Sequence, residues 1–251
     1  MNATYVRIEL FRQSRDIMNL MFAILMPVAM YILFGNMFGG GGENAGNGNV
    51  KFYIMVSMAA YGAAIATTAI AGTAATESLL GWGRQIALTP MKPSGFVASK
   101  ITVAMIVSAA SAAAVFLVGA ATGAQADTAG IWALSYAITV AGSGVFALYG
   151  MAAGLAFKSE TAIGIASSGM VFFAFFGNVF LPLSGVLLQI AKFTPMYGYV
   201  GLARYPLTEG VAASGADATD SIWLLLANLV AWALIFAGLA LWAVRRSRTR
   251  K

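Results

Sequence analysis

The chain has 251 residues, of which 60% are hydrophobic and only 10% are charged, and its mean hydropathy is +0.80. Soluble domains usually carry about a quarter charged residues, so this composition excludes a water-soluble globular protein and predicts an integral membrane protein. The absence of cysteine and histidine excludes disulfides, thiolate or imidazole metal sites, and Cys–His or Ser–His catalytic pairs on this chain.

The first segment, residues 2–16, is amphipathic rather than apolar. Val6, Leu10 and Phe11 recur at helical spacing, with arginines between them. This pattern is typical of a helix that lies in the membrane interface, and a charged tail before the first span is the alternative. A secretory signal is excluded because the apolar stretch that follows is long enough to span and has no small-residue cleavage site close behind it.

Six stretches carry the roughly 20 apolar residues that are needed to cross about 30 Å of hydrocarbon. They predict membrane-spanning helices over residues 17–38, 52–75, 101–122, 131–157, 162–181 and 222–244. In the fourth span, Gly150 and Gly154 form a small-xxx-small pair, which predicts close helix packing within the subunit. The expected fold is an all-α membrane protein with a single transmembrane domain over residues 1–251.

Residues 183–203 are apolar as well, but Pro195 and two glycines interrupt them. Each uninterrupted piece has only about 10 residues, which is too short to span, so the segment predicts a re-entrant helical pair between the fifth and sixth spans. Pro182, Ser184, Gly185 and Pro195 are assigned to it. The alternative is a seventh span, which would place the two chain ends on opposite sides of the membrane.

The distribution of charge decides between six and seven spans. With six, one side of the membrane carries twelve basic and four acidic residues and the other carries three basic and five acidic, which together make the 15 and 9 of the chain. The positive-inside rule then places both termini in the cytoplasm. A seventh span would put the basic residues of 245–251 outside. The net charge of +6 therefore indicates membrane orientation and not nucleic-acid binding.

No catalytic or phosphate-binding motif accompanies these spans. The sequence has no Walker-type glycine loop, no metal-ligand spacing and no Gly-x-Ser-x-Gly elbow. The middles of the predicted spans are almost free of ionisable residues, which argues against a proton relay or an ion-coupled pump. The energy for any active transport would have to come from a partner protein.

The segment between the second and third spans, residues 77–100, is the most informative positive feature. Apolar residues recur at helical spacing from Leu79 to Ile86, and Thr89-Pro90 ends the helix because proline disfavours a helical residue before it. A short amphipathic helix followed by a rigid turn can transmit movement from a docked soluble partner. A surface connector that rests on lipid headgroups is the alternative.

A second segment, residues 181–197, adds a Leu-Pro-Leu-Ser-Gly-Val run followed by Thr194-Pro195-Met196-Tyr197. The pattern of the first loop is carried by Glu77, Gly81, Trp82, Arg84, Gln85, Thr89, Pro90, Pro93, Phe96, Val97 and Lys100. With both segments in this order, the chain resembles bacterial ABC permeases of the type-2 export class, which includes the daunorubicin-resistance and nodulation-export permeases. The family usually has a more charged stretch after the glutamate, whereas Ser78-Leu79-Leu80 follow here.

The resemblance implies a permease subunit of an ATP-driven exporter built from two permeases and two separate ATPase subunits. The amino-terminal helix would contact the ATPase, and the loop would insert into a cleft on it. The coupling residues that it implies are Glu77, Gly81, Trp82, Arg84, Gln85, Thr89 and Pro90. ATP and Mg would bind the partner, with no cofactor, catalytic residue or metal site on this chain. The expected location is the bacterial cytoplasmic membrane, as a homodimer or a heterodimer.

Candidate substrate contacts lie among the aromatic and amide residues of the spans. Large aromatics with a few polar groups suit a hydrophobic or amphiphilic cargo, such as a drug, a lipid or a secondary metabolite. The candidates are Asn36, Tyr61, Phe172, Phe176 and Asn178. Packing against lipid or a dimer partner is the commoner use of such aromatics, and the two asparagines are the better candidates because an amide in hydrocarbon needs a partner.

Two other functional classes stay open. A membrane-embedded lipid-modifying enzyme would need paired polar or ionisable residues at one membrane depth, and the sequence offers no convincing set. A passive channel or a scaffold for another complex is the other class. The long apolar coupling loop argues mildly against a channel or scaffold, and ATP-independent flux through the reconstituted pure protein would support it.

Overall fold

The computed structural model describes residues 3–39, 43–77, 93–157, 161–211 and 219–248. Every named element within these residues is a helix, which confirms the all-α prediction. In chain order the elements are α1 (Ala3–Arg15), α2 (Ile17–Leu20), the π-helix η1 (Met21–Leu25), α3 (Met26–Phe38), α4 (Val50–Glu77), α6 (Pro93–Ala121), α7 (Ala129–Phe157), α8 (Thr161–Phe176), α9 (Gly185–Ala191), α10 (Pro195–Thr208) and α11 (Ile222–Arg248).

Five helical stretches of the described chain are long and apolar enough to cross a membrane. They are Met21–Phe38, Val50–Glu77, Gly95–Ala121, Ala129–Ala156 and Ile222–Ala243. These five stretches correspond to five of the six predicted spans.

The fifth predicted span, residues 162–181, contains the shorter apolar helix α8 of 16 residues. At 1.5 Å per residue such a helix measures about 24 Å, less than the ~30 Å of hydrocarbon. The helix ends at Phe176 because Gly177 and Asn178 follow it, and Asn178 has a φ of 60° in the left-handed region that terminates helices. The crossing over residues 162–181, and with it the total of six crossings, therefore stays a prediction.

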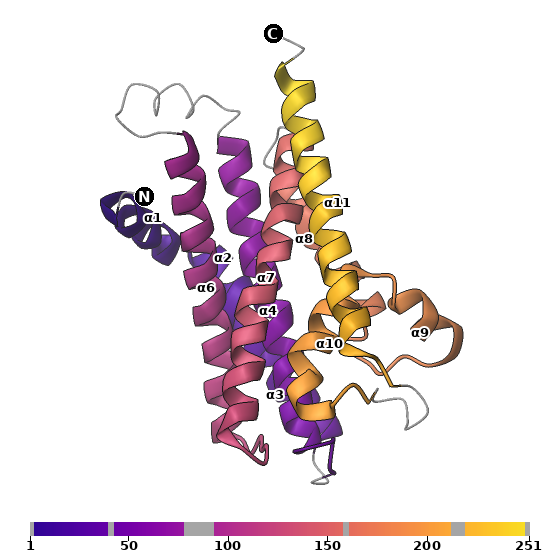
Figure 1. Cartoon of the computed structure of the whole chain (residues 1–251). Coiled ribbons are helices and arrows are strands. Elements are labelled where there is room, and N and C mark those ends of the chain that lie inside the picture. The colour runs from indigo at the N-terminus through magenta and orange to yellow at the C-terminus, as the bar shows by residue number, and fades with distance from the viewer. Residues whose placement is uncertain (1–2, 40–42, 78–92, 158–160, 212–218, 249–251) are drawn as a thin grey trace.

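Helix α4 lies at the centre of the bundle (Figure 1). It contacts α3, α6, α7, α8 and α10, and its apolar stretch is buried throughout. Alanine, glycine, serine and threonine supply most of this helix, and such small side chains let neighbouring backbones approach closely. These small residues therefore allow α4 to contact several other helices at once.

The contact between α4 and α7 depends on two glycines. A Cβ atom added at Gly150 would collide with the carbonyl oxygen of Thr68, and one at Gly154 would lie 2.5 Å from the carbonyl oxygen of Gly72. The close approach allows the Thr68 hydroxyl to donate to the carbonyl oxygen of Phe146 on α7, at 3.2 Å. The predicted helix packing at Gly150 and Gly154 is confirmed.

Helix α1 lies across the outside of the bundle, beside α6 and towards the end where α4 finishes and α6 begins (Figure 1). Val6 and Leu10 pack against a buried cluster that includes Ile70 of α4 and Val103 of α6. Phe11, the third residue of the predicted apolar face, is 59% exposed, and the Arg15 guanidinium lies 4.3 Å from its ring centroid. The location of this helix in the membrane interface stays a prediction.

Helices α9 and α10 are two short helices at the other end of the bundle, near the start of α11 (Figure 1). Gly185 begins α9 with a φ of 59°, which the absence of a Cβ permits. Ser184 occupies the N-cap position without a side-chain capping bond. Pro195 begins α10, and the hydroxyl of Thr194 accepts a hydrogen bond from the Tyr197 N–H at 3.3 Å.

The break between α9 and α10 is fixed to α11. Asn228 Nδ2 donates to the carbonyl oxygen of Lys192 and Trp232 Nε1 donates to that of Phe193, both at 2.8 Å. The predicted interruption of the segment 183–203 is therefore present, but it falls at 192–194, and α10 continues to Thr208. How deeply the pair enters the membrane stays a prediction.

Candidate functional site

The two ends of the predicted coupling loop lie next to each other. Glu77 is the last residue of α4, and Lys100 lies two turns into α6. Lys100 Nζ is 2.8 Å from Glu77 Oε2. The other predicted coupling residues lie outside the described residues: Gly81, Trp82, Arg84, Gln85, Thr89 and Pro90. Of the predicted coupling set, the structure thus places Glu77, at the point where the loop begins.

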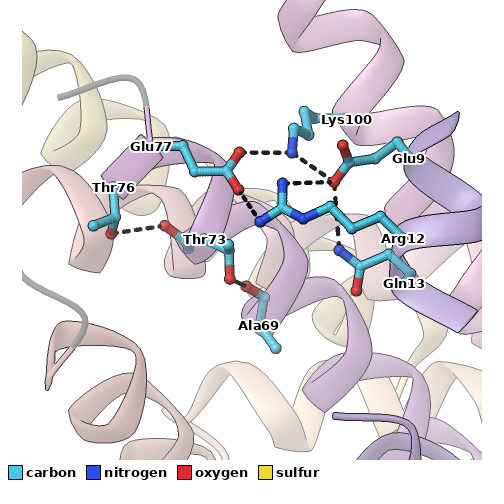
Figure 2. A network of polar contacts seen from close by, with 9 residues as sticks. Glu9, Arg12, Gln13, Ala69, Thr73, Thr76, Glu77 and Lys100 are labelled. Atoms are coloured by element: carbon cyan, nitrogen blue, oxygen red, sulfur yellow. Dashed lines mark hydrogen bonds and ion pairs between the residues drawn. The ribbon is translucent and has the colours of Figure 1, made fainter. Parts of the chain in front are cut away.

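Helix α1 completes a cluster of four charged residues with these two ends (Figure 2). Lys100 Nζ lies 2.6 Å from Glu9 Oε1, and Arg12 Nη2 lies 2.5 Å from Glu77 Oε1. Arg12 Nη1 also lies 3.7 Å from Glu9 Oε1. We call Glu9, Arg12, Glu77 and Lys100 the charged cluster. It joins α1, the end of α4 and the start of α6 through ion pairs.

Burial makes the lysine the central member of the charged cluster. The Lys100 side chain is 4% exposed, those of Glu9 and Glu77 are 5% and 12% exposed, and that of Arg12 is 51% exposed. The two carboxylates and the two cations balance in formal charge. A buried ion that loses its partner is strongly destabilising, so the three helices are held in one arrangement as long as the cluster is intact.

The sequence contained a signal for Glu9 that the predicted site did not use. Helical spacing places Glu9 on the same face of α1 as Val6, Leu10 and Gln13, and this face packs against the protein. Gln13 Nε2 lies 3.5 Å from Glu9 Oε1. A carboxylate on the apolar face of an amphipathic helix requires a buried cation, and here that cation is Lys100.

Aromatic side chains cover the charged cluster on the α1–α6 side. The Tyr5 ring packs against Phe96 with centroids 5.9 Å apart, and Lys100 Nζ lies 5.6 Å from the Phe96 centroid. Burial, with the carboxylates of Glu9 and Glu77 nearby, raises the pKa of Tyr5 to about 12. Tyr5 is therefore a neutral phenol at neutral pH and adds no third negative charge to the cluster.

The predicted substrate-pathway residues do not gather at one place. Tyr61 is 1% exposed in the core, where its ring packs against Phe180 at 5.1 Å. Phe172 is 61% exposed and lies on the surface of α8 with Phe176, their centroids 4.5 Å apart. Asn36 is exposed on α3. Asn178 is 6% exposed, and its Oδ1 accepts a hydrogen bond from the Leu183 N–H at 2.8 Å, across the link that holds Pro182.

Arg204 is a buried cation that sequence reasoning did not single out. It lies on α10 and is 5% exposed. Its Nε donates to Ser57 Oγ of α4 at 2.8 Å, and its Nη1 donates to the Asn178 carbonyl oxygen at 2.9 Å. From the sequence, Arg204 was assigned to the basic residues that lie outside the spans. The residues next to it give no sign that α10 folds back against α4.

The charged cluster links α1, the end of α4 and the start of α6 by ion pairs. Glu77 directly precedes residues 78–92 in the chain, and one member of the cluster, Arg12, is half exposed.

Comparison with known protein families identifies the family of this chain. A family model described as ABC-2 type transporter matches residues 3–207, from the first turn of α1 into α10. A comparison with curated proteins found no significant match. The family match covers most of the chain and includes every member of the charged cluster. The chain therefore belongs to the ABC-2 type transporter family and is a membrane-embedded ABC transport permease subunit that is not itself catalytic.

Proposed function

We propose that this permease exports hydrophobic or amphiphilic compounds from a bacterial cell, with energy from a separate ATP-binding subunit. Members of the family generally pair with such a subunit. The observation that carries the proposal is the charged cluster, in which Lys100 bridges Glu9 and Glu77 at 2.6 and 2.8 Å. ATP and Mg would bind the partner, and the drug, lipid or secondary metabolite would cross between permease subunits.

The proposed topology has six crossings and both termini in the cytoplasm. The residues after Phe176 would complete the fifth crossing, and α9 with α10 would form the re-entrant pair on the outer side. The excess of basic residues on the loop, the amino-terminal segment and the carboxyl-terminal tail supports this orientation. Helix α1 would lie at the cytoplasmic membrane surface, with Phe11 and Ile8, 59% and 61% exposed, towards lipid.

The proposed coupling runs from the ATPase through the segment 78–92 to the charged cluster. Docking on Gly81, Trp82, Arg84, Gln85, Thr89 and Pro90 would displace the adjoining ends of α4 and α6. Ion pairs to α1 would then make the three helices move as one unit, and the central position of α4 would pass the motion to the rest of the bundle.

A second permease copy is part of the proposal. Phe172 and Phe175 on α8 are 61% and 53% exposed, and Leu33 and Met37 on α3 are 58% and 66% exposed. Apolar surfaces of this kind face either lipid or another subunit. In a dimer of identical or sister chains, they would border the substrate pathway together with Asn36 and Phe176.

The test is transport by the reconstituted complex. The permease is co-purified with its ATP-binding partner, reconstituted into proteoliposomes and screened with fluorescent amphiphiles for movement that depends on ATP and Mg. We expect ATP-dependent movement that is lost when the ATPase is inactivated. Equal movement with and without ATP would instead support a passive channel, and the exporter proposal would be wrong.

A further inference from the structure

A cavity of about 500 Å³ lies at the end of the bundle opposite the charged cluster. Its walls come from the end of α3, residues 43–46, the start of α4, the link between α8 and α9, and the end of α10 with Val211 after it. Pockets that bind small molecules measure about 300–1,000 Å³. The cavity is therefore large enough for a drug-sized or single-chain molecule.

The apolar wall of the cavity includes Phe38, Ile54, Phe180 and Leu181. Phe180 packs among other rings, since its centroid lies 5.1 Å from that of Tyr61 and 5.0 Å from that of Phe175. This wall offers an apolar surface to an alkyl or aromatic group.

The polar end of the cavity is formed by Tyr53, Asn178 and Thr208. Asn178 is 94% buried, its Oδ1 is occupied by the Leu183 N–H, and no described residue accepts a hydrogen bond from its amide nitrogen. The left-handed φ of 60° is a conformation that asparagine tolerates better than most residues. This side chain therefore presents a fixed donor to the cavity.

The same three residues also line a smaller space of about 30 Å³ over Arg204. A space of that size holds one water molecule. The guanidinium makes hydrogen bonds to Ser57 Oγ through Nε and Nη2 and to the carbonyl oxygens of Asn178 and Val179 through Nη1 and Nη2. These four bonds use four of its five N–H groups, so one donor on Nη1 remains.

The charge of Arg204 is not neutralised by an ion pair within the described chain. Its neighbours are carbonyl and hydroxyl oxygens and the ring of Tyr53, whose centroid is 4.0 Å from the guanidinium carbon. Asp220 lines the same small space, but it is paired with Lys192 at 2.9 Å and accepts from the Tyr197 hydroxyl. The carboxylate on the cavity wall, Glu43, is exposed and hence screened by solvent.

We propose that this cavity is a binding site for an anionic amphiphile. Its carboxylate, sulfate or phosphate group lies against Tyr53 and Asn178 and reaches Arg204 through one water in the smaller space, and its apolar part lies against Phe180 and Leu181. The buried positive charge selects an anion because its field is poorly screened. This inference rests on the proposed export function and assigns the outward-side contact of the cargo.

Photolabelling of the purified full chain in zwitterionic lipid nanodiscs tests the site. Three diazirine probes share one twelve-carbon chain and carry a sulfate, a hydroxyl or an ammonium group. We expect saturable labelling of the cavity residues by the sulfate probe, about tenfold stronger than by the ammonium probe. Equal labelling by all three probes, or sulfate labelling away from the cavity, would overturn the proposal.

Two variants and one control sharpen this test. Asn178→Asp keeps the acceptor for Leu183 but adds a negative charge, so it should abolish the sulfate preference. The control Gln125→Glu also converts an amide to a carboxylate, but Gln125 is exposed and does not line the cavity, so this variant should leave the preference unchanged. Ile54→Trp fills the cavity and should reduce labelling by every probe. Unchanged labelling in either cavity variant contradicts the proposal. Sulfate labelling that persists without ATP-dependent transport would overturn the exporter and leave the site standing.

Discussion

Lys100 is a buried cation between two carboxylates, and its removal leaves both of them without their shared partner. The variant Lys100→Met should therefore destabilise the protein by about 3–5 kcal/mol, the range for breaking a buried pair. Arg12→Gln, which removes a half-exposed member, should cost about 1 kcal/mol or less. Thermal unfolding in detergent measures both, and equal stability of the two variants would contradict the burial argument.

Ser111 donates a hydrogen bond to a backbone carbonyl oxygen in the first predicted span that has no helical partner. Pro27 has no N–H, so the carbonyl oxygen of Ala23, four residues earlier, has lost its normal helical partner. The Ser111 hydroxyl of α6 donates to that oxygen. The chain widens into η1 at this point, where the Met26 N–H donates to the Met21 carbonyl oxygen.

The variant Ser111→Ala should therefore lower stability by about 0.5–2 kcal/mol, because it leaves the Ala23 carbonyl without a partner. Ser135→Ala is the matched control. Ser135 is equally buried, but its hydroxyl has no hydrogen-bond partner among the described residues. Chemical denaturation of the two variants should separate them, and a loss at Ser135 as large as that at Ser111 would refute the explanation.

At the scale of elements, the α4–α7 contact should tolerate no additional atoms at Gly150. Gly150→Ala places a methyl group against the Thr68 backbone and must separate the two helices, with a cost of about 1–3 kcal/mol typical of overpacking. In Gly144→Ala on the same helix, the added methyl group would lie 3.8 Å from its nearest atom, Met105 Sδ, which is an ordinary van der Waals distance. This variant should be neutral or slightly stabilising because alanine has a higher helix propensity than glycine. Similar unfolding temperatures for the two variants would contradict this account.

Helix α8 shows why element boundaries could be predicted only in part. The apolar run from 162 to 181 has the composition of a complete span, and hydropathy alone contains no sign that it stops at Phe176. The stop comes from the backbone of Asn178, which is held in its left-handed conformation by the Leu183 N–H and by Arg204. Leu183 lies in the link before α9 and Arg204 lies on α10, so the backbone conformation of Asn178 depends on contacts that a hydropathy profile does not contain.

At the scale of the whole molecule, the features that could be predicted from the sequence are those set by residue periodicity and composition. The all-helical architecture, the five long apolar helices and the packing role of Gly150 and Gly154 all follow from local pattern. The charged cluster was only half predicted. Glu77 was identified by resemblance, but Glu9 and Arg12 lie 65 or more residues before it along the chain. Arg12 pairs with Glu77 and Glu9 pairs with Lys100 only because α1 folds back onto α6.

The central claim is that the charged cluster makes α1, α4 and α6 move together when the ATPase displaces the ends of α4 and α6, and that this movement drives transport. The direct measurement is transport per ATP hydrolysed by the reconstituted complex with the variant Glu77→Gln, which removes one charge while Glu9 still pairs with Lys100. We predict that the complex still assembles and hydrolyses ATP but that transport per ATP falls about tenfold or more. An unchanged ratio of transport to hydrolysis in Glu77→Gln would contradict the account.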